Sequence, residues 1–366
     1  MDSDRLARWF TQFAEIECPD LPFYRALCLG MADDAALLEL LLSAAPGQWR
    51  PNLLLAALHD LVLQHPDEPF ARYYGTVGGS FAEGTDPLPL AREFIADHRS
   101  DVDRLVATRS TQTNEVNRSC LWFAALRVAA ADLPDRPMAF VEIGASAGLN
   151  LRFDRYAYDF GDGVVRGNTD SSVRLACRVD GATLSLDSSV EISHRVGLDR
   201  DPVDLADPAE RRWLKACIWP EQPERHARFD AAADLWAADP LPIVADDAVD
   251  GIADLVESID DEAHVVIVNS WVLTYLSTDR RAAFERVVDL LGSDRDLTRI
   301  SAEGEGVAAW VPSDDARPAP HTVVGMRRYR DGIRTEARVA ECHPHLAWLD
   351  WRSSLVPGSA EVPERS

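Results

Sequence analysis

Between residues 6 and 63, apolar side chains recur every three or four positions, which is the spacing of one face of a helix. The leucine-rich stretches at 37–42 and 53–61 are the clearest examples. Prolines separate these stretches and end helices, because proline has no N–H to donate and clashes with the preceding turn. The pattern predicts an all-helical N-terminal region, residues 1–112.

The pattern changes after residue 138, where short apolar runs alternate with stretches of helical period. The run at 264–271 is continuous in Val and Ile, as expected for a parallel strand that is covered on both faces. The other apolar runs lie at 139–143, 192–199, 241–245 and 297–303. We therefore predict an α/β domain over residues 113–352, built on a mostly parallel sheet.

Asp-Gly pairs mark the predicted hairpins, since glycine adopts the positive φ angles that tight turns require. The pairs at 162–163 and 180–181 predict two hairpins, which form an insertion near residues 157–190. The pair at 331–332 predicts a C-terminal antiparallel hairpin. Residues 353–366 are expected to form a flexible tail.

The stretch 139–150 joins a strand to a predicted helix through a turn of small residues. Glu142 lies near the end of the strand, and Gly144 and Gly148 lie in the turn. Glycine lets the backbone approach a ligand closely, because it has no Cβ. The N–H groups at the start of a helix favour an anionic group. The stretch therefore predicts a ligand-binding loop.

The spacing of Glu142, Gly144 and Gly148 resembles the first motif of class I S-adenosylmethionine-dependent methyltransferases. Asp199 at the end of the second strand and Asn269 at the end of the fourth add to the resemblance. Asp199 lies 51 positions after Gly148 instead of roughly 20, and the predicted insertion accounts for the excess. The resemblance implies a Rossmann-like methyltransferase-type sheet that ends in an antiparallel hairpin.

The resemblance also implies a role for each matching position. For S-adenosylmethionine, the resemblance places Glu142 at the amino group, and Gly144, Ser146 and Gly148 along the methionine moiety with Asn150 beside them. It places Asp199 at the ribose and Asp246 or Asp247 at the adenine. Asn269 is expected near the reacting centre. Arg118, Glu115 and Tyr275 are the candidates for orienting or deprotonating a small-molecule substrate. Methyl transfer needs mainly alignment of the two reactants, so a nucleophilic triad is not required.

The whole chain also resembles a family of uncharacterised bacterial domains, DUF2332. The stretches that carry this resemblance are Gln112–Arg118, Glu142–Tyr158 and Leu346–Trp351. That family supplies no established activity, so this resemblance implies no chemistry of its own.

Residues 144–148 also match the nucleophile elbow Gly-x-Ser-x-Gly of serine hydrolases, with Ser146 as the nucleophile. The acid and the histidine that should follow in chain order would be Asp246 or Asp247, and then His321, His343 or His345. Such an elbow needs several strands before it, whereas the region before residue 138 is predicted to be helical. A non-catalytic cofactor-binding relative of methyltransferases is a third alternative.

Composition and charge narrow the range of partners. The chain has 366 residues and a net charge of −24, which repels the phosphate backbone of nucleic acid. The first residues do not read as a signal peptide, and no apolar run is long enough to span a bilayer. Six scattered cysteines without a C-x-x-C pair predict reduced thiols. We therefore expect a cytoplasmic protein with no membrane or nucleic-acid partner.

Histidines give no sign of a metal site in the sequence. His59 and His65 lie near the end of a predicted helix and are interpreted as surface or capping residues, because no further ligands are found for a metal. His343 and His345 are interpreted as structural for the same reason. No metal is expected.

Overall fold

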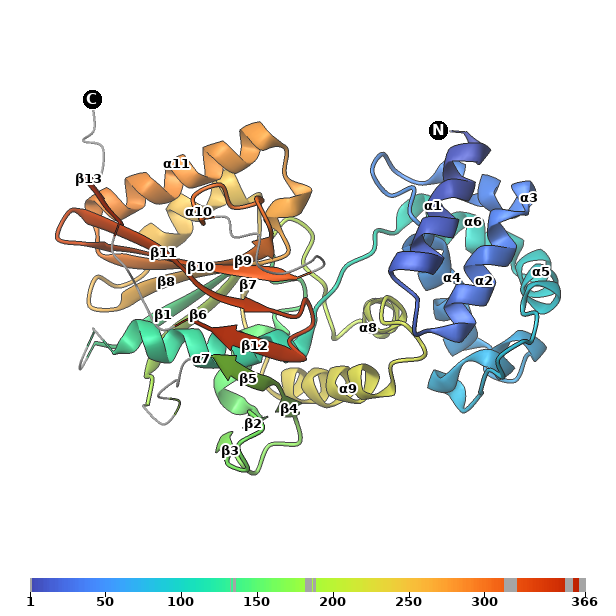
Figure 1. Cartoon of the computed structure of the whole chain (residues 1–366), viewed down its shortest axis with the longest axis horizontal. Helices are drawn as coiled ribbons and strands as arrows, with labels where there is room; N and C mark the ends of the chain where they lie inside the picture. Colours follow the sequence, from blue (N-terminus) through green and yellow to red (C-terminus); the bar gives the residue numbers. More distant parts are fainter. Residues whose placement is uncertain are drawn as a thin grey trace. The chain divides into compact units, whose positions relative to one another are not determined.

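The computed structural model of the chain describes residues 2–131, 133, 136–181, 186, 189–312 and 321–352, together with the backbone of 358–361. The chain divides into two compact units (Figure 1). The helical unit contains residues 1–113 and 204–230, and the sheet unit contains residues 114–203 and 231–366. Each unit has its own apolar core.

The helical unit confirms the predicted helical N-terminal region. Its helices are α1 (Ser3–Ile16), α2 (Pro22–Ala32), α3 (Ala35–Leu38), α4 (Pro51–Gln64), α5 (Leu88–Asp97), α6 (Arg99–Thr108) and α8 (Pro208–Ala216), with the short 3-10 turns η1 (Glu39–Ser43), η2 (Pro69–Tyr73) and η3 (Gly75–Val77). Most of α4 is buried, because leucines occupy its faces and other helices surround it. The segment 204–230 returns to this unit, where Glu221 accepts the N–H groups of Phe23 and Tyr24 at 2.8 and 3.0 Å.

The sheet unit is a mixed α/β structure with a large, mostly parallel sheet. Its strand order is β7 (Ile243–Ala245), β6 (Ile192–Asp199), β1 (Met138–Ile143), β8 (His264–Ser270), β9 (Leu297–Gly304), β10 (Thr322–Arg330), β11 (Ile333–Cys342), β12 (Trp348–Trp351) and β5 (Arg178–Gly181). The strands from β7 to β9 are parallel. The predicted C-terminal hairpin is confirmed, since β10 and β11 pair antiparallel around Asp331 and Gly332.

Helices cover both faces of this sheet. In Figure 1, α7 (Ser119–Ala130) lies on one side of the sheet, and α10 (Ala248–Glu257) and α11 (Thr278–Asp294) lie on the other. The alternation of side chains along β1 fits this layering: Phe140 contacts Trp122 of α7, whereas Ala139 and Val141 belong to the core beneath α10 and α11. The further helix α9 (Pro223–Ala238) contains the third boundary between the units along the chain, after Asp230.

The order of the parallel strands reverses direction between β1 and β8. From β1 the chain passes to β6 and then to β7 on one side, and afterwards to β8 and β9 on the other. Ligands of open α/β sheets bind beyond the carboxyl ends of the strands at such a reversal. Ile143 lies opposite Asn269 at this point, so the loops after β1 and β8 begin side by side.

The insertion after β1 differs in part from the prediction. Its first hairpin is confirmed, because β2 (Ala157–Asp159) and β3 (Val165–Gly167) pair antiparallel. The first arm of the predicted second hairpin is divided between two sheets. Its strand β4 (Arg174–Ala176) pairs parallel with β2, whereas β5 joins the main sheet beside β12. Of the residues expected in the second arm, 182–186, all but Leu186 lie outside the described residues.

The C-terminal segment adds one strand. β13 (Gly358–Glu361) pairs antiparallel with β11, so part of the expected flexible tail is a strand, and residues 353–357 and 362–366 lie outside the described residues.

The six cysteines are free thiols, and five of them are buried. Among the helices described here, none combines the length and the apolarity that crossing a bilayer would need.

Candidate functional site

The loop after β1 is a buried turn with an unusual backbone. Gly144, Ser146 and Gly148 have φ angles of 72°, 54° and 72°. All three lie in the left-handed region, which glycine adopts freely and serine adopts at a cost of about 1 kcal/mol. Every residue from 145 to 150 is buried.

The predicted helix after this loop is a 3-10 segment, η5 (Leu149–Arg155), broken by non-helical angles at Arg152. The carbonyl of Leu149, which an α-helix would use for the N–H four residues later, accepts the Tyr156 hydroxyl at 2.5 Å. The predicted helix is therefore present as a 3-10 helix and not as an α-helix. Its first N–H, that of Leu149, donates to Asn114 Oδ1.

Several main-chain N–H groups of the loop donate to the protein itself. The Gly144 N–H donates to the carbonyl of Leu198 at 2.8 Å, and the Ser146 N–H donates to the Asp199 carboxylate at 2.7 Å. The Leu149 N–H donates to Asn114 Oδ1 at 3.2 Å. These bonds fix the loop between the end of β6 and the segment that precedes α7.

The two loop glycines permit close packing against the turn after β8 and against β7. A Cβ on Gly144 would lie 2.6 Å from Val272 Cγ2, which is closer than real Cβ contacts. A Cβ on Gly148 would lie 3.0 Å from the Ile243 side chain. The side of Gly144 that a Cβ would occupy is therefore filled by Val272.

Glu142 is the most perturbed acid of the loop region. Its side chain is 5% exposed, and Oε2 has no hydrogen-bond partner among the described residues. The pKa of Glu142 is raised to about 8. Burial is the largest cause; a hydrogen bond from Asn150 and the charge of Arg118 oppose the rise, and the charge of Asp199 adds to it. A buried carboxyl with a pKa near neutrality is a candidate general acid or base.

The segment that precedes α7 forms a polar wall beside the loop. Asn114, Glu115, Arg118 and Ser119 are all buried. Arg118 donates to the carbonyls of Pro344 at 3.2 Å and Ser270 at 3.4 Å, and the Ser119 hydroxyl contacts the Asn150 amide at 2.8 Å. The structure thus brings Arg118 and Asn150 together with Glu142.

A capped 3-10 turn precedes α7. Glu115 caps this turn, η4 (Val116–Arg118), with its carboxylate accepting the Asn117 N–H at 3.1 Å. α7 begins only at Ser119, so Asn114 and Arg118 do not share a helix face. Asn114 instead reaches the loop, because the chain before the turn is extended.

Asn269 lies at the end of β8 but points into a buried network. Its amide donates to Ser301 Oγ at 3.1 Å and to Glu303 Oε1 at 2.8 Å, and it accepts from Arg299 at 3.0 Å. Glu303 also accepts the N–H groups of Val272 and Leu273 at 2.9 and 3.0 Å. The role of Asn269 is therefore to hold the turn after β8, through Glu303.

Glu303 was not singled out from the sequence. It ends the predicted strand 297–303, and an acid at the carboxyl end of a parallel strand is the signal that could have found it. Burial raises the pKa of Glu303, while hydrogen bonds from the turn after β8 oppose the rise.

The remaining predicted residues lie further out. Asp246 is exposed, and its N–H donates to the Asp199 carbonyl at 3.0 Å, which places it beside the end of β6. Asp247 caps α10 and pairs with Arg280. Tyr275, in the short turn η6 (Leu273–Tyr275), is 67% exposed.

Ser146 occupies the centre of the loop, with 4% of its surface exposed. β1, which precedes it, is the first strand in the described part of the chain. The histidines that a hydrolase would use make other contacts, since His321 lies 3.6 Å from Glu305, and His343 accepts the N–H of His345 at 3.0 Å. The geometry therefore gives the hydrolase interpretation little support.

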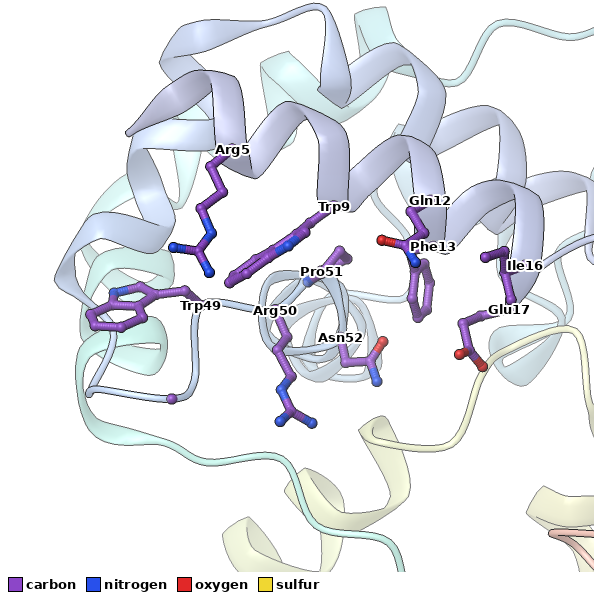
Figure 2. Close-up of a pocket in the computed structure, with 11 residues that line it drawn as sticks. Arg5, Trp9, Gln12, Phe13, Ile16, Glu17, Trp49, Arg50, Pro51 and Asn52 are labelled. Atoms are coloured by element: carbon purple, nitrogen blue, oxygen red, sulfur yellow. The ribbon is translucent and has the colours of Figure 1, made fainter. Parts of the chain in front are cut away.

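The helical unit contains a separate pocket of about 590 Å³ between α1 and the start of α4 (Figure 2). Trp9, Phe13 and Trp49 line it together with Arg5 and Arg50. The Arg5 guanidinium lies 4.9 Å from the centre of the Trp9 ring. The lining thus combines aromatic surface with two arginines and one acid, Glu17.

Comparison with known proteins places the chain in a family. A family profile described as "Uncharacterized protein conserved in bacteria (DUF2332)" matches residues 7–351. The chain belongs to the DUF2332 family. A comparison with curated proteins finds no match. As a DUF2332 member, the chain is matched across the helical unit and the whole parallel sheet, so both units belong to the family's common architecture.

Proposed function

We propose that the sheet unit binds S-adenosylmethionine and that the protein is a methyltransferase acting on a small molecule. The observation that supports this most is the position of Asp199, at the carboxyl end of the strand next to β1 and directly against the loop after β1. An acid in that place can accept both hydroxyls of a ribose. The reversal of strand order between β1 and β8 supports the same location.

Some residues at the carboxyl ends of β1, β6 and β7 match their expected part of the cofactor better than others do. Asp199 would bind the ribose, Asp246 would lie near the adenine, and the buried Glu142 with its unpaired Oε2 would receive the amino group. Gly144 fits less well, because Val272 fills the space beside it. The methionine moiety is therefore assigned to Ser146 and Gly148, with Asn150 behind them.

The bound cofactor would supply an electrophilic methyl group, and the chain would align the acceptor with it. Arg118 is the residue best placed to orient an acceptor, since it lies beside Glu142 and the end of β8. Glu142 could hold or take a proton near neutral pH, because burial raises its pKa to about 8. Glu115 would act indirectly, by holding the turn that presents Arg118.

Calorimetric titration with S-adenosylmethionine and S-adenosylhomocysteine tests this proposal, with NAD as the control ligand. The wild-type protein should bind both sulfur compounds, and Asp199→Asn should weaken binding at least ~10-fold through the lost ribose contacts. Asp260→Asn is the matched control, because Asp260 also accepts a main-chain N–H, that of Glu262, at 2.9 Å in the sheet unit. Absence of heat and of any thermal shift with both compounds at millimolar concentration would refute the proposal.

A second candidate is a cofactor-binding relative without activity. It is favoured by the network around Asn269 and Glu303, whose polar groups bond to one another and to the turn after β8. That arrangement stabilises the fold but offers few groups to a substrate. Conversion of S-adenosylmethionine to S-adenosylhomocysteine in the presence of a small-molecule library distinguishes the two, since only a methyltransferase would turn the cofactor over.

A further inference from the structure

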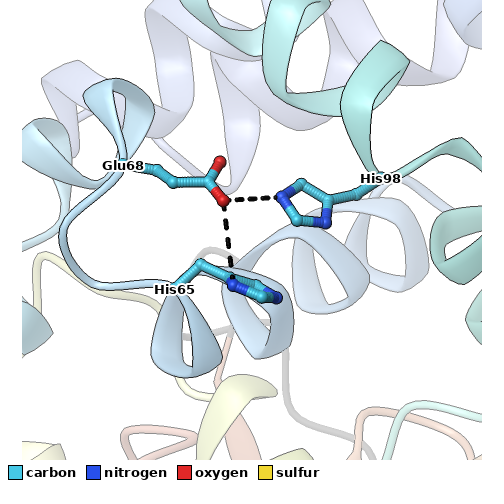
Figure 3. Close-up of side chains that lie close together, drawn as sticks. All are labelled: His65, Glu68 and His98. Atoms are coloured by element: carbon cyan, nitrogen blue, oxygen red, sulfur yellow. Dashed lines mark hydrogen bonds and ion pairs between the residues drawn. The ribbon is translucent and has the colours of Figure 1, made fainter.

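Three side chains with metal-binding atoms meet on the helical unit (Figure 3), two of them close in the sequence, His65 and Glu68, and one distant, His98. His65 ends α4, Glu68 precedes η2, and His98 lies between α5 and α6. One nitrogen of each histidine and one oxygen of Glu68 lie within 4.8 Å of one another. In Figure 3 both rings turn a nitrogen toward the same carboxylate oxygen.

The distances suit a small divalent ion. His98 Nε2 lies 2.9 Å from Glu68 Oε1, and His65 Nδ1 lies 3.7 Å from the same oxygen. Tetrahedral zinc, with bonds of about 2.0 to 2.1 Å, needs ligand atoms roughly 3.3 Å apart. The two separations of 2.9 and 3.7 Å lie on either side of that value, and the third, between the two histidine nitrogens, is no longer than 4.8 Å.

The rings are held in place by packing rather than by the exposed carboxylate alone. The His98 ring contacts Phe94, with ring centres 4.6 Å apart, and Phe94 packs in turn on Phe70. The His65 and His98 rings lie 4.4 Å apart at a tilt of 34°. Ligands oriented by their surroundings bind metal more tightly than mobile ones.

The three side chains can also be reached from solvent. The side chains of His65, Glu68 and His98 are 40%, 34% and 14% exposed. An ion could therefore enter directly, and water could take a fourth position. Two histidines and one glutamate with an open fourth position form a ligand set that zinc enzymes use.

We propose that His65 Nδ1, Glu68 Oε1 and His98 Nε2 bind a divalent transition metal, with Zn²⁺ as the first choice because imidazole and carboxylate ligands suit it. The net charge of −24 favours the approach of a cation. The site belongs to the helical unit and does not depend on the S-adenosylmethionine proposal. It revises the interpretation of His65 as a capping residue without metal partners: His65 does end α4, and the partners come from Glu68 and His98.

Titration of chelator-treated full-length protein with Co²⁺, and then with Zn²⁺, tests the proposal. Co²⁺ should give the visible absorption bands of tetrahedral cobalt with one ion per chain, and Zn²⁺ should displace it. His98→Ala and Glu68→Gln should each lower the affinity at least ~10-fold. His194→Ala is the matched control, since His194 is an exposed histidine of the sheet unit, and it should leave binding unchanged.

Circular dichroism identifies any variant that fails to fold, and Glu68→Gln keeps the size of the side chain. A stoichiometry well below one would overturn the proposal. So would equal affinity in the wild type and in folded Glu68→Gln, because the metal would then lie elsewhere.

Discussion

Asp199 accepts the main-chain N–H of Ser146 at 2.7 Å through one carboxylate oxygen, and that of Asp201 at 2.9 Å through the other. Ser146 has a φ of 54°, a conformation that serine adopts only at a cost, so this bond helps to hold the loop in its shape. The end of β6 thus fixes the loop after β1. A ligand that contacts one of these two strand ends would also meet the other.

Glu142 should make the free energy of unfolding fall as the pH rises. Its folded pKa is about 8, against 4.5 for the unfolded chain, so the folded state retains a proton that the unfolded state has lost. Between pH 4.5 and 8 this lowers the free energy of unfolding as pH rises, by about 1.4 kcal/mol per pH unit at most. Relative to wild type, Glu142→Gln should therefore be more stable at pH 8 than at pH 5.

Denaturant unfolding of both proteins at pH 5, 6.5 and 8 checks this expectation. Glu257→Gln is the control, because Glu257 is exposed in the same unit. An identical pH dependence for Glu142→Gln and wild type would show that Glu142 is ionised in the folded protein.

His59 and His226 should make the helical unit sensitive to acid. Contrary to the sequence interpretation, His59 is fully buried, with ring nitrogens 3.0 Å from the Ala216 carbonyl and 2.8 Å from the Thr76 hydroxyl. Burial lowers the pKa of His59 to about 3 and that of His226 to about 4. Because the unfolded histidines bind protons near pH 6.5, stability is complete above that pH and is lost as pH falls toward 4.

Thermal unfolding between pH 7 and 4 measures this loss. His226→Gln should remove one titrating group and flatten the dependence, by about 1.4 kcal/mol per pH unit. His194→Gln, at an exposed position, should behave like wild type. A dependence that is equally steep in His226→Gln would contradict a neutral, buried His226.

Gly144 should be required for folding, so a substitution there does not test ligand binding cleanly. Gly144→Ala combines a φ of 72° with a contact of 2.6 Å to Val272, and should cost about 2 to 4 kcal/mol. Gly306 has a φ of 74° but nothing within 4 Å of its would-be Cβ, so Gly306→Ala should cost only about 1 kcal/mol. Equal losses in denaturant unfolding would show that Val272 moves aside.

Ser146 should not react as a hydrolase nucleophile. Its side chain is buried, and the strand before it is the first of the described sheet. A fluorophosphonate probe should therefore leave the folded protein unlabelled, while an active serine hydrolase in the same assay is labelled. Stoichiometric labelling that disappears in Ser146→Ala would restore the hydrolase interpretation.

Hydrophobic periodicity was enough to predict the helical region and the parallel strands, because these depend on which side chains must be buried, and the Asp-Gly pair at 331–332 predicted the C-terminal hairpin. It did not predict that 204–230 returns to the helical unit, which depends on contacts such as Glu221 with the start of α2. The 3-10 form of Leu149–Arg155 was also missed, since the Tyr156 hydroxyl that takes the Leu149 carbonyl is a tertiary contact.

For the candidate sites, too, the sequence pattern predicted positions along the strands but not the tertiary contacts. A strand-end pattern indicated Asp199 and Glu142, because the carboxyl ends of parallel strands share one edge of a sheet. It gave no indication that Val272 fills the space at Gly144 or that Asn269 binds Glu303. The pairing of His98 with His65 could not be predicted from the sequence. The two residues lie 33 positions apart and meet only through tertiary packing, of α6 on α4 and of α5 on η2.

Ultraviolet cross-linking of radiolabelled S-adenosylmethionine to the full-length protein, followed by mass spectrometric mapping, tests the central claim most directly. The label should fall within residues 138–152 or 192–203, and an excess of unlabelled S-adenosylhomocysteine should prevent it. Label confined to other segments, or labelling that the excess does not reduce, would contradict a cofactor site between the β1 loop and the end of β6.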